Sequence, residues 1–243
     1  MPIRVLIAPD KFKGTLTAAQ AARAIAHGWR RARPADALDV FSISDGGDGF
    51  GEVLGELLGA RPRKVRTLNA AHEPCAARWW WEPATQTAII ESARVIGLAM
   101  LPPGKFHPFD LDTFGLGAVL RAAATLGAKR CVVGIGGSAT NDGGFGVARA
   151  LGWRFLDGSG RELESWTGLD TLVRIMPPKR TRLFPSLTVA VDVRNPLLGT
   201  HGATRIYGPQ KGIRPLDFAR AERCLKRLAE RSRTPGGRDF ARE

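Results

Sequence analysis

Five polar, glycine-containing segments hold the residues that could do chemistry: 9–14, 45–49, 134–144, 192–202 and 207–212. The first four follow apolar runs typical of strands, and the fifth adds Lys211. Ligands of open α/β sheets bind outside the carboxyl ends of the strands, so we expect these segments to converge on one cleft. Their aspartates, lysines and glycines are the residue types that phosphoryl transfer needs for Mg²⁺ ligation, for phosphate binding and for orienting the attacking hydroxyl.

The segment 134–144 carries five glycines interleaved with Ser, Thr, Asn and Asp. Glycines let backbone N–H groups approach phosphate oxygens, and the two hydroxyls can add donors. A single tight turn explains one or two glycines but not five. We therefore assign phosphate binding to the centre of this loop, namely Gly136, Gly137, Ser138, Ala139, Thr140 and Asn141.

Gly134, Gly136 and Ala139 also match the dinucleotide fingerprint G-x-G-x-x-A. That motif requires a helix to begin inside it, so that the pyrophosphate rests on the helix N-terminus. The glycines that follow, Gly143 and Gly144, disfavour an early helix by roughly 1 kcal/mol each. An NAD(P)-dependent oxidoreductase is thus the second hypothesis.

Five aspartates fall at expected strand ends or in the loops that follow them: Asp10, Asp45, Asp48, Asp142 and Asp192. A loop aspartate is usually a turn former or a helix cap. For Asp48, which precedes an expected helix, that alternative is equally good. Asp192 ends an otherwise apolar strand, where a buried carboxylate would need a metal or a substrate hydroxyl as its partner.

The expected elements alternate as in an α/β sheet. The run 3–8 predicts a strand covered on both faces, and 17–32 predicts a helix with a Thr17/Gln20 capping box. Further expected elements are strands at 38–43, 75–81, 86–91, 130–135 and 187–193 and helices at 112–126 and 215–230. We divide the chain into an N-terminal α/β lobe (1–68), a second α/β lobe (69–212) and a C-terminal helix and tail returning toward the first lobe (213–243).

Composition excludes several classes of protein. The formal net charge of +13 comes mostly from scattered arginines without interleaved aromatic residues, so we expect a solvated basic surface and no nucleic-acid partner. A positive field would still attract anionic substrates. The three cysteines show no C-x-x-C pair, and the four histidines have no metal-ligand spacing. Without an apolar run of about 20 residues or a signal peptide, we expect a cytoplasmic protein with no membrane partner.

Five motifs together resemble the glycerate kinase family, the bacterial type that acts on D-glycerate: 8–14 (APDKFKG), 45–49 (DGGDG), 134–144, 192–197 (DVRNPL) and 208–212 (GPQKG). The resemblance implies two α/β lobes around a cleft and ATP- and Mg²⁺-dependent phosphorylation of glycerate, commonly at its 2-hydroxyl. It places six side chains in or near that cleft: Lys13, Asp45, Ser138, Asn141, Asp192 and Lys211.

We assign roles on this basis. Asp192 is our choice of base, with Lys13 and Asp45 as the other catalytic candidates, and Asp45 and Asp192 as Mg²⁺ ligands. Lys211 joins the glycine loop in binding the nucleotide. Arg94 and Asn195 are assigned to the substrate, whose carboxylate needs a cation that Lys13 or Arg94 could provide.

The chain departs from the family pattern at Lys11, where a small residue is usual, and at Phe50, where threonine is usual. Lys11 would either crowd the cleft or point to solvent. The family normally continues past residue 243 with a segment that completes the N-terminal lobe. We therefore expect an unpaired sheet edge and exposed apolar surface in that lobe. A catalytically inactive chain, a dimer, or dependence on a second polypeptide all remain open.

Overall fold

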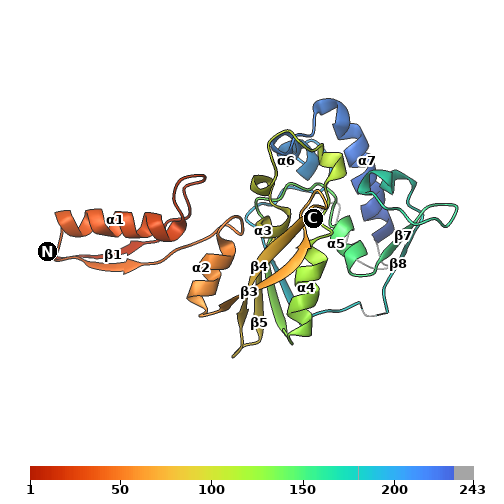
Figure 1. Ribbon diagram of the computed structural model, residues 1–243. Coiled ribbons are helices and arrows are strands. Elements are labelled where there is room, and N and C mark those ends of the chain that lie inside the picture. The colour runs from red at the N-terminus through yellow and green to blue at the C-terminus, as the bar shows by residue number, and fades with distance from the viewer. Residues whose placement is uncertain (180, 233–243) are drawn as a thin grey trace.

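The computed structural model describes residues 1–179 and 181–232 and has a mixed α/β fold (Figure 1). Its N-terminal unit consists of the parallel strands β1 (Arg4–Ile7) and β2 (Ala37–Val40), joined by helix α1 (Ala18–Ala32). Thr17 and Gln20 form the reciprocal capping box at the start of α1, as the sequence predicts. In Figure 1 this unit projects from the larger body of the molecule.

Only one face of the β1–β2 sheet is covered. Ile7 packs against Ala22 and Ala26 of α1, whereas Leu6 is 66% exposed and Phe41, just beyond β2, is 53% exposed. The prediction that the first strand is covered on both faces is therefore wrong for the described residues. The expected unpaired edge and exposed apolar surface are both observed, because the described sheet has two strands.

The larger body is built on a five-stranded sheet of order β3-β4-β5-β6-β9. Strand β4 is antiparallel to its neighbours β3 and β5, and β5, β6 and β9 are parallel. The central strand β5 is buried along its whole length. The strands are β3 (Arg61–Leu68), β4 (Pro74–Glu82), β5 (Thr87–Glu91), β6 (Arg130–Gly134) and β9 (Ser186–Ala190).

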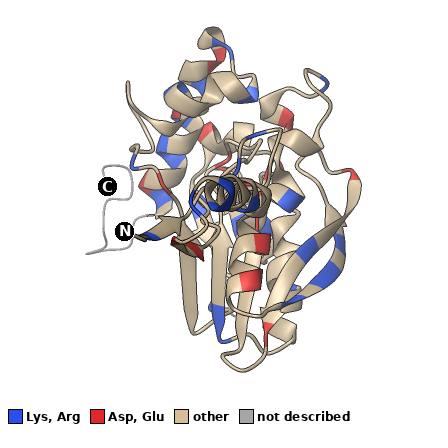
Figure 2. Cartoon of the chain, turned by 90° about the vertical axis from the view of Figure 1, so that its left-hand side faces the viewer, with Lys and Arg blue, Asp and Glu red and all other residues tan. Residues whose placement is uncertain are grey.

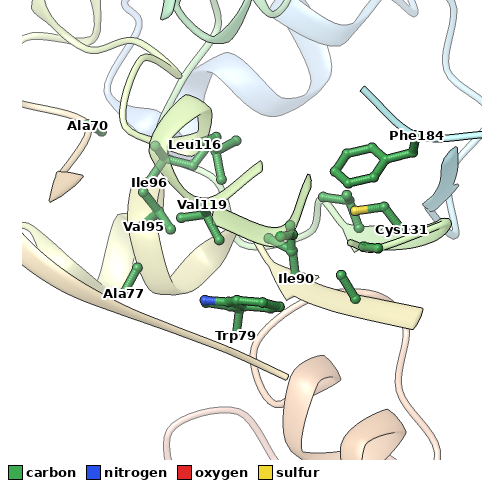
Figure 3. Packing of buried hydrophobic residues seen from close by; sticks show 14 of the residues in the cluster. Ala70, Ala77, Trp79, Ile90, Val95, Ile96, Leu116, Val119, Cys131 and Phe184 are labelled. Atoms are coloured by element: carbon green, nitrogen blue, oxygen red, sulfur yellow. The ribbon is translucent and has the colours of Figure 1, made fainter. Parts of the chain in front are cut away.

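Successive side chains of a strand point to opposite faces of the sheet, and helices pack on both faces. On one face Trp79 and Ile90 pack in the main core beneath α4 (Leu116–Thr125), as Figure 3 shows. On the other face Trp80 and Ile89 pack against α2 (Phe50–Leu57), which includes Phe50. Phe50, one of the departures from the family pattern, is therefore a core residue.

The division expected at residue 68 does not match the packing. Strand β3 pairs with β4 from Arg61 to Leu68, and α2 packs on the same sheet. Both elements belong to the larger body, so the N-terminal unit ends soon after β2. The helix expected to begin at Asp112 begins instead at Leu116, since Asp112 accepts a hydrogen bond from the N–H of Phe114 in the preceding turn.

A smaller module completes the larger body. The antiparallel pair β7 (Arg154–Leu156) and β8 (Arg174–Met176) lies beside the 3-10 helix η3 (Trp166–Thr171). Helix α7 (Phe218–Ser232) packs on η3 through Cys224 and Leu228, rather than on the N-terminal unit to which we expected it to return. Residues 233–243 lie outside the described residues. The remaining elements are α3 (Ala93–Ile96), α5 (Phe145–Ala150), α6 (Ala203–Lys211), η1 (Leu98–Met100), η2 (Pro108–Asp110) and η4 (Pro215–Asp217).

Lysine and arginine are spread over many elements, among them α1, β3 and α7 (Figure 2). On the edge strand β3 such charges oppose edge-to-edge pairing with another chain. Of the helices described, none is both long enough and apolar enough to cross a membrane.

Candidate active site

The loops that follow β1, β2, β6 and β9 come together at the carboxyl ends of these strands. The N–H of Gly136 donates to the carbonyl of Gly46 (3.0 Å), and the N–H of Ile135 donates to Ala190 at the end of β9 (3.3 Å). The N–H of Ile43 donates to the carbonyl of Pro9, which joins the β1 and β2 loops (3.2 Å). The loops after β1, β2 and β6 therefore meet beside the end of β9, whereas convergence of all five segments, 192–202 included, on one cleft stays a prediction.

Several loop glycines are required by this close approach of backbones. A Cβ on Gly136 would lie 2.7 Å from the Cα of Gly47, and a Cβ on Gly134 would lie 2.5 Å from the carbonyl oxygen of Gly46. A Cβ on Gly46 would lie 2.8 Å from the carbonyl oxygen of Ala190. Part of the glycine content that we attributed to phosphate binding therefore serves loop-to-loop packing.

The backbone of the glycine loop is already partly hydrogen-bonded. The N–H groups of residues 135 and 136 are used as above, that of Ala139 donates to Ile96 (2.8 Å), and that of Thr140 donates to Ser138 Oγ (3.1 Å). The N–H groups of Gly137, Ser138 and Asn141 have no acceptor within the described parts of the chain. Gly137 is exposed and Ser138 half-buried, so an anion would meet the loop at these two residues.

The helix after this loop, α5, begins at Phe145, beyond two glycines with positive φ. The segment 135–144 contains no helix. The G-x-G-x-x-A match therefore lacks the helix that would hold a dinucleotide pyrophosphate, which disfavours the oxidoreductase hypothesis.

Helix α6 supports the second half of the loop. Lys211 Nζ donates to the carbonyl oxygen of Thr140 (2.6 Å), and the side-chain amide of Asn141 donates to Thr204 Oγ1 (3.0 Å). Burial lowers the pKa of Lys211 to about 8, although the charge of Asp142 acts in the opposite direction. We expected Lys211 in a loop, but it is the last residue of a helix that contains Gly208 and Pro209.

Asp142 is a fully buried carboxylate to which the sequence assigned no specific role. It accepts hydrogen bonds from the N–H and the hydroxyl of Thr113 (3.0 and 2.7 Å) and from the N–H of Gly146 (2.9 Å). Burial raises the pKa of Asp142 despite these donors, which favour the ionised form. Asp142 thereby ties the end of the glycine loop and the start of α5 to the segment before α4.

Lys11 and Asp45 form an ion pair where the loops after β1 and β2 meet. Lys11 Nζ lies 2.9 Å from Asp45 Oδ1 and 4.0 Å from Asp10 Oδ2. Asp45 Oδ1 also accepts the N–H of Gly47 (2.8 Å). Although burial alone would raise the pKa of Asp45, these donors hold it below its ordinary value. The sequence left open whether Lys11 crowds the cleft or points to solvent. In the structure its ammonium pairs with Asp45 and does not point to solvent.

The carboxylate of Asp48 faces the glycine loop, with its oxygens 3.2 and 3.3 Å from the position that a Cβ on Gly137 would take. The helix-cap alternative for Asp48 is wrong, because the N-cap of α2 is Gly49. The carboxylate of Glu91 performs that task instead, accepting the N–H groups of Gly49 (3.1 Å) and Gly51 (2.9 Å).

The carboxylates at the loop junction are too few to enclose a Mg²⁺ ion on their own, but they suit an ion that is also bound to substrate phosphates. The described residues contain no group of three or more His, Cys, Asp or Glu side chains that could hold a metal ion. Asp45 Oδ2, however, has no hydrogen-bond donor among them. Mg²⁺ commonly binds through one or two carboxylates, water and substrate phosphates.

Arg94 is already paired. Its guanidinium contacts the carboxylate of Glu52, lies 3.3 Å from Glu91 Oε2 and stacks 5.5 Å from the ring centroid of Trp80. Burial raises the pKa of Glu91, which the charge of Arg94 opposes. Binding of a substrate carboxylate by Arg94 stays a prediction, and these ion pairs disfavour it.

Three other residues to which we assigned a role are exposed: Lys13, Asp192 and Asn195. Asp192 is two residues beyond β9, an edge strand on which Leu187 is 57% exposed, so the burial that we inferred for Asp192 is absent. Lys13 is exposed without a partner in the described chain. Asn195 is held by its amide, which donates to the carbonyl of His201 (2.9 Å), and by the hydroxyl of Tyr207.

The fold and the loops define an α/β protein in which acidic and glycine-rich loops meet at the carboxyl ends of parallel strands. The chain belongs to the glycerate kinase family, whose family model matches residues 5–242.

The chain is similar to several named proteins. It is 40% identical over 213 residues to a glycerate kinase of Bacillus subtilis, covering 86% of this chain and 56% of that protein. It is 35% identical over 233 residues to the glycerate 2-kinase of Escherichia coli, covering 94% and 61%. A crystal structure from Salmonella typhimurium LT2, assigned as a glycerate kinase 2, superposes with a TM-score of 0.80 at 35% identity, covering 95% and 62%. The chain thus spans about 60% of the length of these relatives.

Proposed function

We propose that the chain carries out ATP- and Mg²⁺-dependent phosphorylation of D-glycerate, with 2-phosphoglycerate as the product. The observation that carries the proposal is the meeting of the loops after β1, β2 and β6 beside the carboxyl end of β9. Family membership and the relatives named as glycerate kinases support the substrate, and the Escherichia coli relative supports the 2-hydroxyl.

The nucleotide phosphates are assigned to residues 136–141 and Lys211. The free N–H groups of Gly137 and Ser138 supply donors that need no rearrangement. Ala139, Thr140 and Asn141 are buried, so they shape the loop through α6 and do not form its surface. Lys211 adds a positive charge beneath the loop, where its ammonium donates a hydrogen bond to the carbonyl oxygen of Thr140.

Asp45, through its free Oδ2, and Asp192 are the residues that would hold Mg²⁺. The ion would neutralise charge on the nucleotide phosphates. The low pKa of Asp45 keeps its carboxylate ionised, which suits a ligand. Lys13, at the exposed end of the β1 loop, is assigned to the charged groups of the bound substrates.

We assign Asp192 as the base that takes the proton of the substrate hydroxyl. The carboxylate of Asp192 is exposed and has no donor in the described residues, so the oxygen that would not bind Mg²⁺ is available to accept a proton. Asp192→Asn should abolish phosphoryl transfer, leave ATP binding intact and leave the melting temperature unchanged. Asp170→Asn, at another exposed aspartate, is the matched control. Loss of ATP binding together with transfer in Asp192→Asn would show a structural role instead.

A coupled assay with ATP, Mg²⁺ and D-glycerate tests the whole proposal. Phosphorus NMR of the product decides between the 2- and the 3-position. ATP hydrolysis that proceeds equally without D-glycerate, with no phosphoglycerate formed, would contradict a glycerate kinase. The cytoplasmic location expected from the sequence stays a prediction.

The exposed apolar surface of the N-terminal unit favours a second candidate: a member of the family that is inactive as an isolated chain. Leu6, Phe41 and Ile43 are 66%, 53% and 49% exposed on a sheet of two described strands. A dimer or a second polypeptide would cover them. Sedimentation velocity over a range of concentrations, with activity measured in the same samples, distinguishes a chain that is active as a monomer from one that requires association.

A further inference from the structure

Lys11 lies where the loop after β1 meets the loop after β2. Its ammonium is 2.9 Å from Asp45 Oδ1, and its side chain is 18% exposed. Within the described residues, this is the only side-chain hydrogen bond or ion pair that joins residues 1–40 to the rest of the chain. Lys11 is therefore half-buried and lies at the junction of the two units.

The ammonium also lies beside Gly47, the residue that the glycine loop approaches at Gly136. A Cβ built on Gly47 would be 3.4 Å from Lys11 Nζ and 3.7 Å from the carbonyl carbon of Gly136. Asp45 accepts one of the three N–H donors of Lys11, which leaves two for a ligand. An anion held by the exposed part of the glycine loop would be close to this charge.

The other cations at the junction are less suited to that anion. Arg94 is neutralised by Glu52 and Glu91. Lys211 is beneath the loop and donates to the carbonyl of Thr140. Lys13 is exposed and has no partner among the described residues that would fix it.

Three carboxylates at the junction, those of Asp10, Asp45 and Asp48, would repel an anionic substrate. Lys11 neutralises part of that charge, since it pairs with Asp45 and lies near the other two. We propose that Lys11 binds an oxyanion of the substrates, either the carboxylate of the hydroxy acid or a phosphate oxygen of the nucleotide, and that Asp45 holds it in place. This inference rests on the proposed function.

The test compares Lys11→Met and Lys11→Arg with Lys64→Met, which removes the same charge from the exposed edge strand β3. We expect Lys11→Met to raise KM at least tenfold for D-glycerate if the carboxylate is bound, or for ATP if a phosphate is bound. Lys11→Arg should restore much of the loss, because its charge can still reach Asp45. The melting temperature of each variant separates a folding defect from a binding defect.

Unchanged KM values for both substrates in Lys11→Met would overturn the role of Lys11 while leaving the proposed function intact. If the wild type phosphorylates nothing, the proposed function fails, and Lys11 is then judged by calorimetric titration with D-glycerate and with ATP. Weaker binding of either compound to Lys11→Met than to Lys64→Met would support the inference. Equal binding, or no binding to the wild type, would overturn it.

Discussion

Gly136→Ala tests whether the glycine loop and the loop after β2 are in rigid contact. The added methyl group would lie 2.7 Å from the Cα and 2.9 Å from the nitrogen of Gly47. Carbon atoms in good contact are about 3.5–4.0 Å apart. One loop must therefore move by roughly 1 Å, and the obstacle is backbone, which cannot rotate away as a side chain can.

The expected loss of stability has two parts. Overpacking of this kind costs about 1–3 kcal/mol. The displaced loop would also lose the hydrogen bond from Gly136 to Gly46, which contributes about 1 kcal/mol. We expect the free energy of unfolding to fall by about 2–4 kcal/mol in total.

Urea unfolding followed by tryptophan fluorescence measures this change, because Trp79, Trp80 and Trp81 all lie in the five-stranded sheet. Gly158→Ala is the control: its methyl group would make only an ordinary contact, 3.8 Å from Val173, and should change stability by less than about 0.5 kcal/mol. If Gly136→Ala unfolds at the same urea concentration as the control, the two loops are not packed as described, and the geometry of the candidate site fails with them.

Three further predictions address charge and helix propensity. Glu91→Ala should lower the free energy of unfolding by about 3–5 kcal/mol, because it leaves buried amides and Arg94 without a partner; denaturant unfolding should show a smaller loss for Glu91→Gln, which retains an acceptor. Gly28→Ala should stabilise the exposed middle of α1 by about 0.5–1 kcal/mol, and thermal unfolding monitored by circular dichroism checks this. Because folding lowers the pKa of Lys211 from 10.5 to about 8, its charged form destabilises the folded state below pH 8, and that cost disappears between pH 8 and 10.5. Wild-type stability should therefore rise relative to Lys211→Met as the pH increases across that interval, by at most about 1.4 kcal/mol per pH unit; a constant difference would contradict the assigned pKa.

Local patterns were sufficient for the elements that lie next to the loops. The capping box fixed the start of α1, and the buried apolar run fixed β6 together with the glycine loop that follows it. The β4–β5 hairpin also followed from its strand composition and its Pro-containing turn. Each of these signals lies within about ten residues, so no knowledge of tertiary packing was needed.

Elements whose sequence contradicts their local propensity were missed. Strand β3 reads as a charged loop (RPRKVRTL), and only its pairing with β4 makes it a strand. Helix α6 contains Gly208 and Pro209, which disfavour a helix interior, yet it forms and supports Thr140 through Lys211. In both cases tertiary contacts override weak local preferences.

The side-chain pairings at the candidate site could not be predicted from the sequence. Lys11 and Asp45 are 34 positions apart, and nothing local to either residue indicates their contact. The burial inferred for Asp192 assumed that the apolar run before it is covered, whereas β9 is an edge strand of the described sheet. Whether a strand has a neighbour depends on the whole fold, and this information is absent from the strand itself.

These pairings bear on which aspartate takes the proton. A general base is most effective when its pKa lies near the working pH. The surroundings of Asp45 disfavour that role, because Lys11 and the N–H of Gly47 both donate to its Oδ1 and lower the pKa of Asp45. Removing Lys11 would release Asp45 from this pairing, whereas Asp192 has no donor in the described chain to be released from. A pH–rate profile that keeps its acidic limb unchanged in Lys11→Met therefore favours Asp192, and a limb that moves to higher pH assigns the base to Asp45.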